Sequence, residues 1–462
     1  MTSLALFVIV LGLAALGWLM ARARAIAFRR AAGAERAHSL PNYHGWYVAL
    51  WAAVPALLFL AVWTPVSGNL VTEQVMTSPA AATLPPFEMQ RAAILREARE
   101  IAEGDRPGGF NPQSSELAPV YRSALGHYRT IGAVVALLLA FAGGAFAFSR
   151  VSPHFRARTK VERLVMAGLL AASTIAILTT AGIIASLLFE SIRFFSLVNP
   201  IEFLFGTHWS PQIAIRADQA GSSGGFGAIP LFWGTIFIGA IIAMLVAIPL
   251  GLMSAIYLTQ YARPAVRRWM KPMLEMLAGV PTVVYGYFAA LTVAPLIRDF
   301  GKAIGVASAT SESALAAGLV MGIMIIPFVS SMADDSITAV PQAMRDGSLA
   351  MGATTSETIR KVIVPAALPG IVGGVLLAVS RAIGETMIVV MAAGLAANLT
   401  ANPFASVTTV TTQIVQLLTG DQEFDSAKTL AAFALGLVLF IVTLLLNIVA
   451  LRVVKKYREA YE

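Results

Sequence analysis

Nine stretches of predominantly apolar residues constrain this chain more than any other feature of its sequence. A helix rises about 1.5 Å per residue, so roughly 20 apolar residues are needed to cross the 30 Å hydrocarbon core of a bilayer. We therefore expect an all-α polytopic membrane protein with about nine transmembrane helices. The expected spans are residues 3–20, 46–64, 130–148, 164–189, 229–256, 273–297, 314–332, 367–396 and 430–451.

Composition excludes several classes of function. Only 13% of the residues are charged, against about 25% in soluble domains. The chain has no cysteine, and its five histidines lie far apart with no ligand spacing, so we expect no metal site. It also lacks the Gly-x-x-x-x-Gly-Lys-Ser/Thr loop that cradles nucleotide phosphates. We expect no cofactor in this chain, no enzymatic activity and no nucleic-acid partner, and any ATP must be used by a partner subunit.

The distribution of lysine and arginine predicts the orientation of the spans. With the N-terminus outside, the inner segments carry 21 of the 33 basic residues and the outer segments 11, six of them in one long loop. Short basic loops stay in the cytoplasm, whereas long loops contribute little. Arginines follow the first span rather than precede it, so we expect that span not to be a cleaved signal peptide. The C-terminus is then cytoplasmic.

A basic segment near residues 150–163 divides the chain. Residues 161–462 carry six spans, with a cytoplasmic loop at 335–366, and residues 1–160 form a three-span N-terminal extension with a long outer loop. Within that loop, Phe87–Glu103 is predicted as a surface helix, because prolines precede it, a glycine follows it and opposite charges recur four residues apart. We interpret its charges as a solvated face rather than a ligand site, and the following DRPGGFNPQ as a linker.

The loop at 335–366 contains a spaced motif. Asp346-Gly347-Ser348 is followed after three residues by Gly352, and after nine more by Val362-Ile363-Val364-Pro365. This resembles the coupling loop of ABC-importer permeases, Glu-Ala-Ala, three residues, Gly, nine residues, Ile-x-Leu-Pro. The spacing matches at every step, although Asp replaces Glu, Gly-Ser replaces Ala-Ala and Val replaces Ile and Leu. The resemblance implies that a partner ATPase docks here. The alternative is an ordinary cytoplasmic loop.

The motif also has a local structural interpretation. Gly352 tolerates positive φ and permits a sharp turn between two short helices. Asp346 is expected near the end of the first helix, and Thr354 or Thr355 is expected to cap the second. Pro365 is expected to break the second helix before the next span begins. Such a hairpin would dock as a helix in a groove.

Two ionisable residues lie inside the eighth expected span. Arg381 is about 18 Å along the helix from Pro369, at or beyond the membrane midplane, and Glu385 is one turn further on, on the same face. Intramembrane charges cost at least about 2.5 kcal/mol, so they usually face a cavity and have a function. A guanidinium suits an oxyanion, and a carboxylate can accept a hydrogen bond from hydrogen phosphate but not from sulfate. The alternative is that the two charges only neutralise each other. Gly384 would allow the close approach of a ligand.

Three blocks make the resemblance more specific. GGFGAIPLFWGT from Gly224, AGVPTVVYG from Ala278, and RAIGETM from Arg381 resemble the phosphate-importer permeases of the binding-protein-dependent transport family. The resemblance covers spans four to nine, and the extension also looks like one carried by longer members. It implies a bacterial inner-membrane importer with a related permease of the PstA type, two copies of a PstB-type ATPase and a periplasmic PstS-type phosphate-binding protein.

Further residues of the second and third blocks are candidates for the substrate pathway. They are Thr386 beside Glu385, and Pro281, Thr282, Tyr285 and Gly286 in AGVPTVVYG, with core packing the alternative for Tyr285. Other functions also stay open: the PstA-type partner permease, a permease for another oxyanion such as molybdate or sulfate, and an ion-coupled carrier working alone. Such carriers tend to carry repeated broken helices, and no second copy of the Arg381–Glu385 pattern is present. A membrane-embedded enzyme is the least favoured alternative, because this sequence offers no nucleophile paired with a base.

Overall fold

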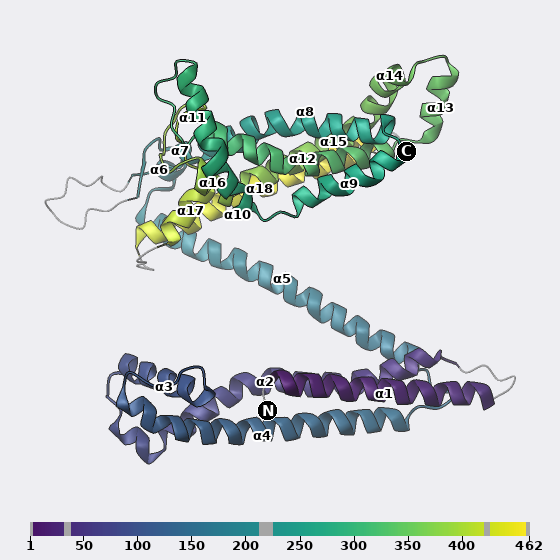
Figure 1. Cartoon of the computed structure of the whole chain (residues 1–462), viewed down its shortest axis with the longest axis vertical. Coiled ribbons are helices and arrows are strands. Elements are labelled where there is room, and N and C mark those ends of the chain that lie inside the picture. The colour runs from purple at the N-terminus through teal and green to yellow at the C-terminus, as the bar shows by residue number, and fades with distance from the viewer. Residues whose placement is uncertain (1–2, 32–37, 212–224, 420–425, 459–462) are drawn as a thin grey trace. The chain divides into compact units, whose positions relative to one another are not determined.

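The computed structural model describes residues 3–31, 38–211, 225–419 and 426–458 (Figure 1). Nine helices in this part of the chain are long and apolar enough to cross a membrane, which confirms the expected fold class and number of spans. The only strands among the described residues are the two-residue pair β1 (Trp209–Ser210) and β2 (Gly225–Phe226). The membrane helices cover residues 4–28, 41–76, 112–149, 157–197, 229–261, 282–303, 314–338, 355–383 and 427–456.

The chain forms two compact units, Met1–Ile177 and Leu178–Glu462. The N-terminal unit contains α1 (Ser3–Ala31), α2 (Pro41–Met76), α3 (Glu88–Glu103), α4 (Pro112–Ser149) and the first half of α5 (Ala157–Leu197). Its first three spans continue well beyond the apolar stretches that predicted them, because helices extend into polar turns that water can solvate.

Small residues let the helices of the N-terminal unit approach closely. Ala14, Ala49 and Ala52 form one buried contact between α1 and α2. On α4, a Cβ at Gly143 would lie 2.1 Å from the carbonyl oxygen of Trp51 on α2, so only glycine fits this crossing. This is the packing expected of membrane helices, which associate through van der Waals contact rather than through a hydrophobic effect.

The surface helix predicted at 87–103 is confirmed as α3. It ends at Gly104, whose φ of 89° is in the left-handed region that favours glycine. The ion pairs Arg96–Glu100 (3.6 Å) and Arg99–Glu103 (3.5 Å) both form. A buried cluster that includes Ile94 and Ala98 of α3 holds the helix against α2 and α4.

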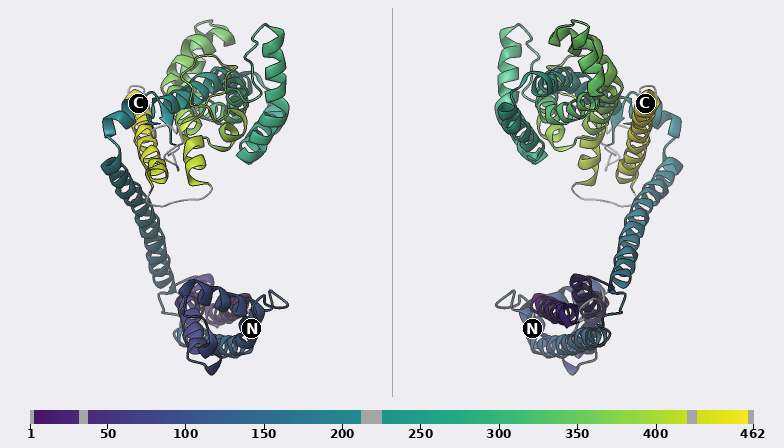
Figure 2. Two further views of the ribbon diagram at one scale, coloured as in Figure 1. Left: turned by 90° about the vertical axis from the view of Figure 1, so that its left-hand side faces the viewer. Right: turned by 90° about the vertical axis from the view of Figure 1, so that its right-hand side faces the viewer.

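The C-terminal unit is built on helices that cross α12 (Ala314–Thr338), whose Met321 and Ile325 are buried. A Cβ at Gly318 would lie 2.4 Å from the side chain of Ile242, so glycine permits this crossing. Figure 2 shows α18 beside the end of α5, and a cluster of buried aromatic and aliphatic side chains joins them. The other helices are α6 (Pro200–Phe205), α7 (Ile229–Thr235), α8 (Ala243–Ile256), α9 (Pro264–Ala278), α10 (Thr282–Phe288), α11 (Ala294–Ala303), α13 (Gln342–Ala350), α14 (Thr355–Thr358), α15 (Val364–Ile383), α16 (Met387–Ala392), α17 (Val410–Leu418) and α18 (Ala427–Arg458).

The boundaries expected for two spans are wrong, because a break in the helix separates part of each. The span expected at 273–297 is divided: α9 is a separate helix with no buried residue, and the membrane helix begins only at Thr282. The break lies at Gly279-Val280-Pro281, where proline disfavours helix in the residue before it. The span expected at 367–396 begins earlier, at Thr355, and stops at Ile383, and the short α16 follows after a break at residues 384–386.

Among the described residues of the C-terminal unit, four π-helical turns widen helices, at Ile236–Ile242, Tyr257–Tyr261, Ala289–Val293 and Ile359–Ile363. The last of them corrects a prediction. Pro365 does not break the helix, because Thr355–Ile383 continues without interruption. A proline ring normally clashes with the carbonyl four residues earlier, and the widened turn just before Pro365 makes room for it.

Candidate functional site

The segment RAIGETM lies at the break between α15 and α16. Gly384 ends α15, and the Glu385 carboxylate then accepts a hydrogen bond from the backbone N–H of Met387 at 3.2 Å. The Thr386 hydroxyl donates to the Gly384 carbonyl at 3.4 Å. Glu385 therefore stabilises the start of α16, because its side chain satisfies one of the N–H groups that a helix leaves unpaired.

The break corrects the predicted relation between Arg381 and Glu385. They do not share one helical face, because α15 ends between them. No ion pair joins them, and within the described ranges no carboxylate lies within 4.0 Å of the Arg381 guanidinium. Arg381 and Gly384 are exposed on this chain, and Glu385 is half-buried. The interpretation in which the two charges simply neutralise each other is not supported by this geometry.

A cluster of buried threonines stabilises the break between α15 and α16. The Thr411 hydroxyl donates to the Glu385 carbonyl at 2.8 Å, and the Val410 N–H donates to the Thr235 hydroxyl at 3.0 Å. Thr409 caps α17 by accepting from the Thr412 N–H at 3.3 Å. Sequence reasoning treated this region as an outer loop and missed α17. The available signal was the segment Thr408-Thr409-Val410-Thr411-Thr412, in which four of five residues are threonine.

AGVPTVVYG contributes to the same region through helix packing. A Cβ at Gly286 would lie 3.0 Å from the Met387 carbonyl oxygen and 2.8 Å from the sulfur of Met391, so glycine brings α10 against α16. Tyr285 is buried in the main core and its hydroxyl donates to the Leu277 carbonyl at 2.8 Å. This favours the core-packing alternative for Tyr285. Thr282 begins α10 and is half-buried, after an exposed Pro281.

The hairpin of the coupling motif lies at the opposite end of the same unit from α16 and α17 (Figure 1). Gly352 has a φ of 86°, which confirms the predicted left-handed turn. Thr354 caps α14 in a reciprocal capping box with Glu357, which confirms the predicted cap. The Ser348 and Thr358 hydroxyls lie 2.9 Å apart and join α13 to α14.

Helix α13 itself is exposed. None of its residues is buried, and Asp346 lies in its middle rather than near its end, where it accepts a hydrogen bond from Gln342 at 3.0 Å. A Cβ at Gly347 would meet nothing within 4 Å. The hydrophobic side chains of Leu349 and Met351 are also exposed. A helix that is joined to the rest of the unit on one side and exposed elsewhere is available to a partner.

A buried carboxylate anchors α9 to α12. Asp334, with a side chain only 7% exposed, accepts from Lys271 at 2.6 Å and from Arg267 at 3.0 Å. The hydrogen bond to Asp334 raises the pKa of Lys271. Because α9 buries no residue of its own, this ion pair is a principal tie between the two helices. Sequence reasoning did not identify it.

Family comparisons match both parts of the chain. Residues 6–179 match a family described as phosphate ATP-binding cassette transporter, and residues 247–459 match the inner membrane component of binding-protein-dependent transport systems. The PstC 1 protein of Mycobacterium tuberculosis is 31% identical over 283 residues, which cover 56% of this chain and 83% of that protein. The chain belongs to the PstC family of ABC transporter permeases.

Other relatives agree. The PstC protein of Mesorhizobium japonicum is 31% identical over 49% of this chain and 72% of its own length. A probable ABC transporter permease, YqgH of Bacillus subtilis, is 32% identical over 54% of this chain and 75% of its own length. A solved inward-facing structure of the MetNI methionine ABC transporter is also similar, with 17% sequence identity and a TM-score of 0.38. The match covers 50% of this chain and 95% of that chain.

The resemblance seen in the motifs is thus confirmed, including the extension, which has its own family match. Members of the PstC family are transport permeases, so this chain is a multi-pass transport subunit rather than an enzyme.

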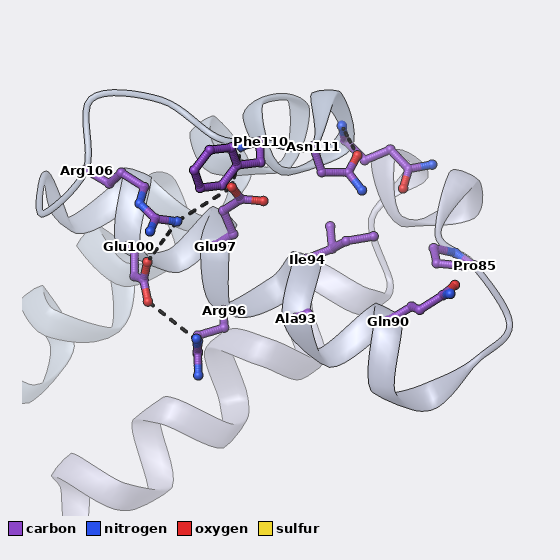
Figure 3. A pocket seen from close by; sticks show the side chains of 11 residues that line it. Pro85, Gln90, Ala93, Ile94, Arg96, Glu97, Glu100, Arg106, Phe110 and Asn111 are labelled. Carbon is purple, nitrogen blue, oxygen red and sulfur yellow. Dashed lines mark hydrogen bonds and ion pairs between the residues drawn. The ribbon is translucent and has the colours of Figure 1, made fainter.

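An open cavity of about 630 Å³ lies beside α3 in the PstC-family extension, and we call it the α3 groove (Figure 3). The charged residues of its lining, Arg96, Glu97, Glu100 and Arg106, neutralise one another. Arg106 lies 3.7 Å from Glu97 and 3.5 Å from Glu100, which also pairs with Arg96. Glu97 accepts a hydrogen bond from the Phe110 N–H, and this bond is the main reason that the pKa of Glu97 is lowered. Two cations therefore meet two carboxylates, as expected for a solvated face.

Proposed function

We propose that this chain is the permease subunit of an ATP-driven importer that moves inorganic phosphate from the periplasm to the cytoplasm. The observation that carries the proposal is the Arg381 guanidinium, exposed at a break in a membrane helix with no carboxylate partner among the described residues. An unpaired intramembrane cation is costly unless it faces water or an anion. Irregular backbone at membrane depth is tolerated where it is buried in protein or borders a cavity.

Glu385 would supply selectivity for phosphate. One of its carboxylate oxygens accepts from the Met387 N–H, and the carboxylate can accept further hydrogen bonds. A protonated oxyanion such as hydrogen phosphate can donate one, whereas sulfate cannot. Arg381 then binds the anion, and Glu385 accepts a hydrogen bond from it only if the anion is protonated. Gly384, Thr386 and Thr282 border the path. Tyr285 supports these residues by packing in the core.

The partners follow from two exposed surfaces. Arg381 is open on this chain alone, so a second permease of the PstA type would be needed to close the path around it. At the other end, the hairpin containing Asp346, Gly347, Ser348 and Gly352 would dock a PstB-type ATPase dimer, with Pro365 inside the helix that leaves it. A PstS-type binding protein would deliver phosphate from the periplasm. ATP is used by the ATPase and not by this chain.

We further propose that the N-terminus is periplasmic and the C-terminus cytoplasmic in a bacterial inner membrane. This orientation follows from the excess of Lys and Arg in the inner segments. It also puts the hairpin in the cytoplasm, where ATP is available. On this proposal residues 1–160 are an extension, and residues 161–462 are the transport core with its coupling loop at 335–366.

Reconstitution tests the function directly. The chain is co-purified from its native membrane, the associated ATPase is identified, and the complex is placed in proteoliposomes with ATP on the hairpin side. We expect uptake of radiolabelled phosphate that requires ATP and is blocked by vanadate, with sulfate a poor competitor. Uptake driven by an ion gradient without ATP would instead identify a secondary carrier, and equal competition by sulfate would exclude phosphate selectivity.

A further inference from the structure

The N-terminal unit contains an interhelical cavity of about 600 Å³ that the proposed transport path does not use. We call it the interfacial cavity. It is bounded by the beginning of α1, the middle of α2, the end of α3 and the first half of α4. Its lining includes Leu6, Leu57, Leu60, Trp63, Arg99 and Arg129.

The cavity lies where the unit passes from apolar to polar. On α2, apolar residues end near Thr64, and on α4 they begin near Ile131. Trp63 donates to the Tyr128 carbonyl at 3.2 Å, so an indole and a phenol ring sit together at this boundary. Trp and Tyr are enriched at the level of lipid headgroups. Gly132 allows the arrangement, because a Cβ there would lie 2.3 Å from the indole nitrogen.

One part of the lining, contributed by α1 and α2, is apolar. Leu57 and Leu60 of α2 and Leu6 and Phe7 of α1 all line the cavity, and Leu60 packs in one cluster with Leu6. Phe7 is 44% exposed, and Leu58 beside the cavity is 64% exposed. Exposed apolar side chains therefore adjoin the apolar lining of the cavity on both α1 and α2.

The mouth of the cavity carries an excess positive charge. Glu103 is the carboxylate between two arginines, at 2.9 Å from Arg129 and 3.5 Å from Arg99. Both arginine side chains are about half exposed. The net charge of the trio is therefore positive by one. This differs from the α3 groove, where two cations meet two carboxylates.

We propose that the interfacial cavity binds one anionic glycerophospholipid. Its phosphodiester accepts hydrogen bonds from Arg129 and Arg99, and one acyl chain lies along Leu57, Leu60 and Leu6. A phosphodiester carries a single negative charge, which matches the excess charge of the trio. Free inorganic phosphate fits less well, because it would leave the apolar wall empty of ligand.

Native mass spectrometry of the full-length purified chain tests this assignment with phosphatidylglycerol, with phosphatidylcholine of the same acyl chains, and with inorganic phosphate. We expect phosphatidylglycerol to be retained in preference to phosphatidylcholine. Arg129→Gln should lower this retention about fivefold, as expected for one guanidinium beside a lipid phosphate. Arg96→Gln, which removes the same charge from the α3 groove, should leave it unchanged.

A second pair of variants tests the acyl chain with the charges intact. A Cβ at Gly68, in the cavity wall, meets nothing within 4 Å, and the same is true of Gly12 on α1, outside the lining. Gly68→Leu should fill the space and lower lipid retention, whereas Gly12→Leu should not. The proposal is wrong if the two lipids are retained equally or if Arg129→Gln and Arg96→Gln behave alike. It is also wrong if inorganic phosphate binds in a manner sensitive to Arg129→Gln but not to Gly68→Leu.

Discussion

The membrane helices of the two units differ in continuity. In the N-terminal unit, α1, α2 and α4 run unbroken for 29 to 38 residues even though α2 and α4 contain internal prolines. In the C-terminal unit, the described spans contain four π-helical turns, and breaks at 279–281 and 384–386 lie at the ends of two spans. In both units the backbone N–H and C=O groups within the membrane must be hydrogen-bonded inside the protein, because lipid offers no hydrogen bonds.

The difference teaches where irregular backbone is concentrated. The breaks and widened turns occur in the unit that carries Arg381 and the hairpin, and at residues 384–386 the freed groups are satisfied by Glu385 and Thr411. The N-terminal unit uses small residues at its crossings and keeps its helices whole. Regular helices suit an anchor or a lipid-binding unit, and irregular ones suit a path whose walls must present polar groups. Five predictions test or sharpen this contrast, from the largest expected effect to the smallest.

Neutralising the intramembrane cation should have the largest effect. We expect Arg381→Gln to reduce phosphate uptake at least about tenfold, because hydrogen bonds to charged groups contribute about 1.5–3 kcal/mol. Uptake per inserted protein is measured in proteoliposomes. Arg96→Gln in the N-terminal unit is the matched loss of charge and should transport normally. Equal transport by the Arg381 and Arg96 variants would remove Arg381 from the path.

Removing the buried carboxylate should free α9. We expect Asp334→Asn to weaken the attachment of α9 to α12 by about 1.5–3 kcal/mol, because Arg267 and Lys271 lose a charged acceptor. Hydrogen exchange of residues 264–278 measures this. Asp335→Asn makes the same charge change at an exposed neighbour that acts on Lys271 without a hydrogen bond, and it should alter exchange much less. Similar exchange in both variants would show that α9 is held by other contacts.

Two glycines of the hairpin offer an internal comparison. Gly352→Ala should destabilise the turn by about 1–2 kcal/mol, because an L-residue is strained at the left-handed φ of 86°. Gly347→Ala, within α13 and in open space, should instead stabilise that helix by about 0.5–1 kcal/mol. Exchange of residues 342–358 and coupled ATP hydrolysis report both. If the two variants changed exchange in the same direction, the conformational argument for Gly352 would fail.

The selectivity role of Glu385 predicts a moderate effect. Glu385→Gln keeps an oxygen that can accept from the Met387 N–H, so the break should persist. We expect discrimination between phosphate and sulfate to fall by about 2- to 12-fold, the equivalent of one ordinary hydrogen bond. Competition assays in proteoliposomes measure the ratio. Unchanged discrimination would assign Glu385 to capping α16 alone.

The smallest effect should be a pH dependence at the end of α3. The pKa of Glu97 is lowered, chiefly by the hydrogen bond from Phe110, so its stabilisation is full above the ordinary value and is lost as the pH falls through the lowered value. We expect protection of the Phe110 amide, corrected for intrinsic exchange, to decline only in acid. In Glu97→Gln the protection should not depend on pH over this range. A wild type without acid-dependent loss would contradict the prediction.

The features predicted from the sequence are those with a strong local cause. Nine spans followed from the length of apolar stretches, and the turn at Gly352 and the cap at Thr354 followed from residues whose conformational preferences act within a few positions. The assignment to a class of transport protein came from the family motifs, and the coupling motif was recognised by its spacing.

The features that were missed depend on partners distant in sequence. Residues 381–387 are compatible with a continuous helix, and the break is stabilised by the Glu385 side chain and by Thr411, 26 residues away. The Asp334 anchor joins residues 63 and 67 positions apart. Pro365 was expected to end a helix because its steric effect is local, but the π-helical turn before it relieves the clash. The site residues themselves stay predictions until uptake is measured.

One uninterrupted helix, Thr355–Ile383, begins at the capped hairpin and ends two residues after Arg381. Its 29 residues extend for about 43 Å. No break interrupts the helical backbone between the hairpin and Arg381, although the helix widens at Ile359–Ile363. On the proposed function, a pull of the ATPase on the hairpin would therefore reach the guanidinium along one helix backbone, and the affinity for the anion would change in step with the hydrolysis cycle.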